Sequence, residues 1–260
     1  VSQAVSTYFR TMHRASATGV LVFLSMLACA QTKPHWAFDL GSSGDDRATA
    51  VVSSPDGAVY IYGTFSGAMS YPGGQIATQG VTDVFLARLD TMGTVQWIRT
   101  GGGPGPERAT DMIADANGNV TVTGQFSGTM SVSGTQLVSN GPSQDAFLVR
   151  YSATGELLWS RAAGSTANAD IGEHVASDAA GNIYWAGEFS GTASFGALQV
   201  SSTYDPGLQG PGVDVFLAKY SAAGDALWLK KGAARREDHV TGLAANADGH
   251  GPAWVNSFFE

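Results

Sequence analysis

Short runs of alternating apolar and polar residues, separated by glycine turns, recur along this chain. The run DAFLVRYSATGELLW covers residues 145–159, and runs of the same design cover residues 83–97 and 214–228. Each run holds an apolar stretch, a turn that ends in Gly and a second stretch that ends in Trp. Period-two alternation around a glycine turn is typical of a β-hairpin. The recurrence therefore predicts a repeat protein built of hairpins.

A second pattern alternates with these hairpins and covers residues 55–67, 116–128 and 179–191. Its turn contains Asp-Gly or Asn-Gly in the first two copies, and glycine takes positive φ there without steric cost. The strand that follows is apolar on both faces, which indicates a sheet covered on both sides. A further apolar run precedes each turn. One unit thus holds four predicted strands, with a variable loop before the Asp-to-Trp hairpin.

Four-stranded units with two apolar faces, repeated in tandem, predict an all-β fold and specifically a β-propeller. A β-solenoid remains an alternative, although solenoid repeats are usually shorter. Three full repeats and part of a fourth are expected, counted from Trp to Trp within residues 36–260: 36–96, 97–158, 159–227 and 228–260. The fourth repeat is interrupted at Pro252, and residues 36–41 match the last strand of a hairpin whose first strand is missing. We therefore expect a fragment of a longer propeller.

The repeated motif resembles a known family. It runs through Gly-Gly or Gly-Ser, an acid, Ala, an apolar strand, a Gly-Asn-Val-Tyr-like turn, Gly-x-Phe and Asp-x-Phe-Leu-Ala-Lys. This combination is similar to the bacterial β-propeller repeat called SBBP, and the similarity covers residues 36 to 258. The resemblance implies a propeller on an exported or cell-surface bacterial protein, often a lipoprotein. It implies no established enzymatic activity, so no functional residues are carried over.

The N-terminal residues 1–30 have the pattern of a secretory signal. An uncharged apolar run at residues 19–28 follows Arg10 and Arg14, and no acid occurs before Asp39. The residues before Cys29 are similar to a lipoprotein box, in which this cysteine would carry lipid. Ordinary cleavage after residue 30 and a buried core segment are the alternatives. We expect export to the cell envelope or the medium, with membrane attachment only through lipid on Cys29.

Charge and cysteine content narrow the classes of partner. The formal net charge is −8, which argues against nucleic acid, since a phosphate-binding face needs a basic patch. The single cysteine, Cys29, excludes an intrachain disulfide. An unknown protein or glycan at the cell surface is the expected partner.

Acids at one repeat position, just before the first strand, are the candidates for a metal site. A ring of these acids could attract a cation at a propeller opening. Alternatively, each acid caps a turn by accepting hydrogen bonds from backbone N–H groups, and the residue pattern favours such caps. These acids are Asp46, Glu107, Asp170 and Asp238. A second set opens each hairpin, where short acids usually satisfy backbone donors: Asp83, Asp145 and Asp214.

No catalytic constellation and no cofactor site is predicted. Trp97, Trp159 and Trp228 end hairpins at equivalent places, which favours packing between repeats over sugar stacking. The five histidines are scattered along the sequence. A non-catalytic binding or scaffolding module is therefore expected. The alternatives are a carbohydrate-active or quinone-dependent enzyme, tested at Asp170, and a lectin that uses Tyr204 in the long insertion of the third repeat.

Overall fold

The computed structural model describes residues 20–23, 37–232, 238–246 and 252–258. Every regular element in these ranges is a β-strand. None of the described residues forms a helix long and apolar enough to cross a membrane. The fold is thus all-β, as the alternating pattern predicts.

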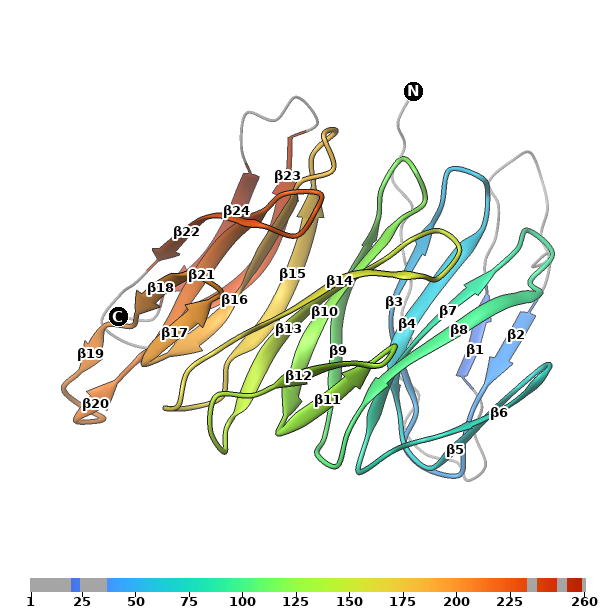
Figure 1. Cartoon of the computed structure of the whole chain (residues 1–260), viewed down its shortest axis with the longest axis horizontal. Coiled ribbons are helices and arrows are strands. Elements are labelled where there is room, and N and C mark those ends of the chain that lie inside the picture. Colours follow the sequence, from blue (N-terminus) through green and yellow to red (C-terminus); the bar gives the residue numbers. More distant parts are fainter. Residues whose placement is uncertain (1–19, 24–36, 233–237, 247–251, 259–260) are drawn as a thin grey trace.

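The strands form a row of antiparallel sheets that follow one another in chain order (Figure 1). The first sheet holds β3 (Arg47–Ser53), β4 (Val59–Phe65), β7 (Asp83–Leu89) and β8 (Val95–Gly102). The second holds β9 (Arg108–Ala114), β10 (Val120–Ser127), β13 (Gln144–Tyr151) and β14 (Leu157–Ala163). The third holds β15 (Ile171–Ser177), β16 (Ile183–Ser190), β21 (Val213–Tyr220) and β22 (Ala226–Gly232). The fourth sheet pairs β23 (Asp238–Ala245) with β24 (Pro252–Phe258).

The first strands of neighbouring sheets, β3, β9, β15 and β23, contact one another in sequence. The fourth strands β14 and β22 are edge strands, whereas β8 pairs further with a short strand of the next repeat. Repeated four-stranded antiparallel sheets with their first strands together resemble the blades of a propeller. The ranges that begin at Trp97, Trp159 and Trp228 start inside a fourth strand, whereas the first three sheets begin at β3, β9 and β15.

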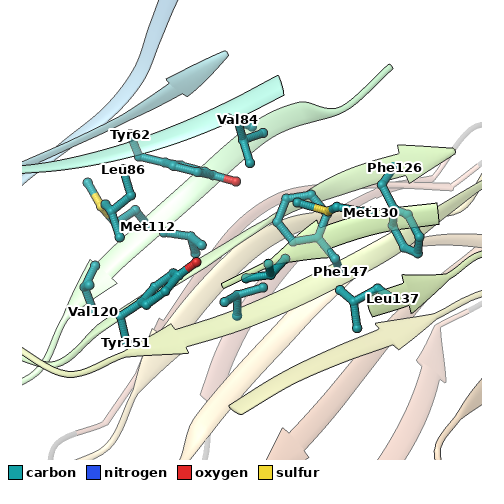
Figure 2. Packing of buried hydrophobic residues seen from close by; sticks show 14 of the residues in the cluster. Tyr62, Val84, Leu86, Met112, Val120, Phe126, Met130, Leu137, Phe147 and Tyr151 are labelled. Atoms are coloured by element: carbon teal, nitrogen blue, oxygen red, sulfur yellow. The ribbon is translucent and has the colours of Figure 1, made fainter. Parts of the chain in front are cut away.

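The two middle strands of each sheet are buried on both faces, because a neighbouring sheet covers each face. Figure 2 shows the core between the first and second sheets, where Tyr62 and Leu86 face Met112, Phe147 and Tyr151. The core between the second and third sheets is centred on a fully buried indole, that of Trp185, whose Nε1 donates to Thr123 Oγ1 at 2.7 Å. Side chains from two sheets fill each layer, so no sheet has a complete core of its own.

A β-bulge in the first strand explains the Gly-x-Phe motif. In the second sheet the register between β9 and β10 shifts beside Gly124, leaving Thr110 without a paired residue. A Cβ on Gly124 would lie 1.9 Å from the carbonyl oxygen of Arg108 and 2.9 Å from the ring of Phe147. Equivalent shifts occur in the first and third sheets, beside Gly63 and Gly187, and in the fourth sheet, where Asn256 takes this position. In the first three sheets, glycine leaves the space into which the bulged strand approaches its neighbour.

The variable loop of each repeat contains a short hairpin that the sequence reasoning missed. These hairpins are β5 (Ala68–Tyr71) with β6 (Gly74–Ala77), β11 (Thr129–Val132) with β12 (Thr135–Val138), and β17 (Thr192–Phe195) with β18 (Leu198–Ser201). Each reaches back to the preceding repeat. For example, Val132 pairs with Gly101 of β8, and Gly164 bridges Ser194. A glycine turn between two short apolar runs was the available signal.

Both ends of the chain add further strands. β1 (Val20–Phe23), inside the predicted signal, pairs with β2 (Ala37–Leu40), so the strand expected to lack a hairpin partner has one in this structure. The remainder of residues 1–30, including Cys29, lies outside the described residues. At the other end, β24 begins at Pro252, where the missing N–H is tolerated at the first position of a strand.

Candidate functional site

The acids at the predicted cation position accept hydrogen bonds from the turn that precedes their strand. Glu107 Oε2 accepts from the Gly103 N–H at 3.2 Å, and Asp170 Oδ2 accepts from the Ser165 N–H at 2.7 Å. The Asp46 carboxylate accepts from the backbone N–H and hydroxyl of one serine in the same way. These are the contacts of turn caps.

Three of these four acids are buried, whereas Asp46 is partly exposed. Glu107 and Asp170 are 1% exposed and Asp238 is 0% exposed, so their carboxylates lie inside the protein between sheets. Within the described part of the chain, no group of three or more His, Cys, Asp or Glu side chains could hold a metal ion.

The hairpin acids lie beside them, and they are fully buried. Asp83 Oδ2 accepts from the Gln79 N–H at 3.1 Å, and Asp145 Oδ2 accepts from the Asn140 N–H at 2.8 Å. A Cβ on Gly102 would lie 2.1 Å from Asp83 Cγ, so this carboxyl group occupies the space of a missing side chain. Gly164 and Asp145 have the same relation. The glycine of the Gly-Gly or Gly-Ser motif thus makes room for an acid.

Backbone hydrogen bonds bring the two sets of acids together in pairs at the junctions between sheets. The Glu107 N–H donates to Thr82 O at 3.0 Å, and the Asp170 N–H donates to Gln144 O at 2.7 Å. Each acid before a first strand therefore lies next to the hairpin acid of the preceding sheet. We call the pair Asp83 and Glu107 the first junction, the pair Asp145 and Asp170 the second junction, and the corresponding position at Asp214 the third junction.

Burial and mutual repulsion perturb these carboxyl groups. Burial raises the pKa of Glu107 to about 8, and the negative charge of Asp83 is the second cause of this rise. The hydrogen bond from the Gly103 N–H acts in the opposite direction. Burial also raises the pKa of Asp145 to about 7, with a further contribution from Asp170. Two bare charges in such a place are unfavourable, so each pair favours a bound proton or a cation.

The repeated tryptophans connect each sheet to the next. Trp97 Nε1 donates to Ala153 O at 3.1 Å, and Trp159 Nε1 donates to Ala222 O at 3.0 Å. The arginine two residues later adds a second bond, from Arg99 Nε to Gly155 O at 2.7 Å. These acceptors lie in the hairpin turn of the following sheet. Trp97 and Trp159 therefore pack between repeats, whereas Trp228 packs against Tyr184 of its own sheet.

Two histidines of first strands pair with acids of the preceding sheet that are distant in the sequence, and no sequence pattern predicts these pairs. His239 Nδ1 lies 2.7 Å from Glu188 Oε1, and His174 Nδ1 lies 3.6 Å from Asp111 Oδ2. Hydrogen bonding to Asp111 raises the pKa of His174. Only the sheet stacking places these groups together.

A half-open hollow of about 420 Å³ lies between the turns of the second and third sheets. Its lining includes Asp115, Asn117, Asp178 and Leu158. Buried Arg150 closes one wall, because its guanidinium bonds the Asp115 carboxylate at 2.5 Å and also a backbone carbonyl of the next sheet. The charged groups that line the hollow are thus already paired within the protein.

No family model matches the chain. Over 233 residues, 82% of the chain, it is 27% identical to the regulatory protein FlaEY of Caulobacter vibrioides. Over 167 residues, 59% of the chain, it is 26% identical to the uncharacterized WD repeat-containing protein L264 of Acanthamoeba polyphaga mimivirus. The matches span 23% and 12% of those proteins. WD repeats build propellers, and the chain is accordingly an all-β repeat protein of propeller type with distant similarity to WD-repeat and FlaEY proteins.

Proposed function

We propose that this chain is a non-catalytic binding or scaffolding module, of the SBBP repeat type, on an exported bacterial protein. The repeated motif of residues 36–258 and the four-stranded sheets support the repeat type. One observation carries the binding role, namely the insertion of residues 202–212, which enlarges the variable loop of the third repeat.

This insertion forms an additional short hairpin, β19 (Tyr204–Asp205) paired with β20 (Gly210–Pro211). Figure 1 shows it beyond the third sheet, next to β17. Its base is fixed, because the Thr203 N–H donates to the buried Asp214 carboxylate at 2.7 Å and the Gly212 N–H donates to Thr203 O at 2.8 Å. A loop that is anchored at its base on a rigid sheet is the usual setting for recognition.

The inserted hairpin presents apolar side chains to solvent, one at its base and one in its turn. Tyr204 is 61% exposed and Leu208 is 58% exposed. Tyrosine offers a large and rigid contact area at low entropic cost, and aromatic residues are enriched in protein interfaces. We infer that Tyr204 and Leu208 contact a protein partner. A glycan that stacks on Tyr204 is the alternative ligand.

Photo-crosslinking tests the contact. A photoreactive amino acid in place of Leu208 should give a specific adduct in the native host, because this residue lies at the proposed interface. Val138 is 62% exposed on β12, in the short hairpin of the second repeat, which has no counterpart of the insertion, and it serves as the control position. We expect the adduct from position 208 alone, and Tyr204→Ser should reduce it at least about tenfold, as for loss of an interface anchor. Equal labelling at both positions would argue against the contact, and a hit on a glycan array would favour the lectin.

Export with lipid on Cys29 is a separate part of the proposal. Palmitate fed to a bacterial host should label the full chain, whereas Cys29→Ser should abolish the label, because the thiol is the proposed attachment atom. Ala30→Gly serves as the control and should keep the label. An unlabelled mature protein that begins at Gln31 would show ordinary cleavage instead.

A further inference from the structure

The three junctions balance the charge of their buried acids in different ways. At the third junction the chain supplies a cation. Lys231 Nζ lies 3.1 Å from Asp214 Oδ2, and it also donates to Ser201 O at 2.9 Å and Thr203 Oγ1 at 3.3 Å. A positive charge thus lies directly on this carboxylate.

At the second junction the backbone supplies the donors. Asp170 uses both carboxylate oxygens, because Oδ2 accepts from the Ser165 N–H at 2.7 Å and Oδ1 accepts from the Ser190 N–H at 2.9 Å. Within this junction, Asp145 Oδ1 has no hydrogen-bond partner among the described residues, and at the third junction Asp214 Oδ1 has none either.

The first junction has no lysine, and the backbone supplies only one donor to each acid, the Gln79 N–H to Asp83 Oδ2 and the Gly103 N–H to Glu107 Oε2. Asp83 Oδ1 and Glu107 Oε1 both lack a hydrogen-bond partner among the described residues, although the side chains are 0% and 1% exposed. The strand register places Thr100 opposite Phe85, as it places Lys231 opposite Phe216. Threonine therefore stands where the third repeat has its lysine.

The two acids of the first junction converge on one short piece of backbone. The carboxyl of Asp83 lies over Gly102, and the Glu107 carboxylate accepts from the N–H of the adjacent Gly103. The carbonyl oxygen of Thr129 also lies against Gly103, 1.8 Å from where a Cβ would stand. Two carboxylates and a carbonyl thus gather around the Gly102–Gly103 peptide.

We propose that the first junction is a divalent cation site, specific for a hard ion such as Ca²⁺, in which Asp83 and Glu107 are the protein carboxylate ligands. Calcium takes oxygen ligands from carboxylates, backbone carbonyls and water in a flexible arrangement, so a pair of acids is sufficient as its charged part. Two buried charges without compensation would oppose packing of the first two sheets, and the ion removes that opposition. The cation would hold the first sheet against the second. It would neutralise the acids of the first junction, as Lys231 neutralises Asp214 at the third junction.

Calorimetric titration of the full chain with CaCl₂, after treatment with chelator, tests the site. We expect one Ca²⁺ per chain and a calcium-dependent rise in Tm of about 5 °C. Asp83→Asn and Glu107→Gln should each weaken binding at least about tenfold, as loss of one charged ligand does. Asp145→Asn and Asp170→Asn, at the second junction, are the matched controls and should leave the affinity unchanged.

A third variant keeps the test valid if removal of either acid prevents folding. Thr100→Lys places an ammonium group at the position of Lys231, and it should abolish the response of Tm to calcium while the protein stays folded. Absence of calcium binding by the wild-type chain would overturn the proposal and would leave a shared proton as the compensation. Binding that survives in Glu107→Gln but is lost in Asp170→Asn would overturn it as well.

Discussion

Gly124→Ala is expected to lower the free energy of unfolding by about 3 kcal/mol, the upper part of the range for overpacking in a rigid interior. The new Cβ would lie 1.9 Å from the carbonyl oxygen of Arg108, and a backbone atom in a paired strand cannot rotate away. The ring of Phe147, at 2.9 Å, blocks the opposite side. Urea denaturation followed by tryptophan fluorescence measures the loss.

Gly242→Ala is the control, because Gly242 lies beside the equivalent register shift in the first strand of the fourth sheet, where no described atom comes within 4 Å of an added Cβ. The first repeat already carries an alanine, Ala50, at the corresponding position. This variant should change the stability by less than about 0.5 kcal/mol, as is usual away from a packed site. A similar loss in both variants would mean that the close approach of Arg108 and Phe147 is not what makes glycine necessary at position 124.

The stability of the chain in chelator should fall as the pH rises from about 4 to 7. Burial raises the pKa of Asp145 from its ordinary value of 3.8 to about 7, so the folded protein holds a proton that the unfolded chain releases. The stabilisation that comes from this bound proton is fully present below pH 3.8 and is lost as the pH rises through 7. At about 1.4 kcal/mol per pH unit, the total loss from this group is on the order of 4 kcal/mol.

Asp145→Asn should reduce this slope by the part that Asp145 contributes, because the amide does not ionise, while Glu107, whose pKa burial raises to about 8, still contributes with the same sign. Asp56→Asn is the control. Asp56 is an exposed acid whose pKa is lowered, first by a backbone hydrogen bond from Ala58, so its own contribution appears at acid pH with the opposite sign. Urea denaturation at half-unit steps of pH provides the comparison. A slope that is identical in wild type and Asp145→Asn would show that the pair at the second junction does not hold the proton.

The strand pattern and the fold class were accessible from the sequence because they depend on local periodicity. The alternation in residues 59–64 and the Asp-to-Trp hairpins directly predict strands that are buried on both faces, and these strands occupy the middle of each sheet. The repeat of the pattern then predicts stacked four-stranded sheets, which the structure confirms.

The pairing of the acids was not accessible, since it depends on contacts between repeats. Glu107 and Asp83 lie 24 residues apart in the sequence and come from different sheets. The sequence reasoning grouped each acid with its copies in other repeats, whereas the structure groups it with a different acid across a junction. The inserted hairpins were missed because their strands are only four residues long and lie within a loop of varying length.

The contacts between sheets indicate how a chain of this kind can gain or lose whole repeats. Trp97 contacts the turn of the second sheet in the same way that Trp159 contacts the turn of the third, through the carbonyl groups of Ala153 and Ala222. Each repeat thus carries a donor group for its successor and an equivalent acceptor group for its predecessor. Duplication or deletion of one whole repeat would join surfaces that already match, so a gene of this kind can gain or lose repeats by recombination without any new contact evolving.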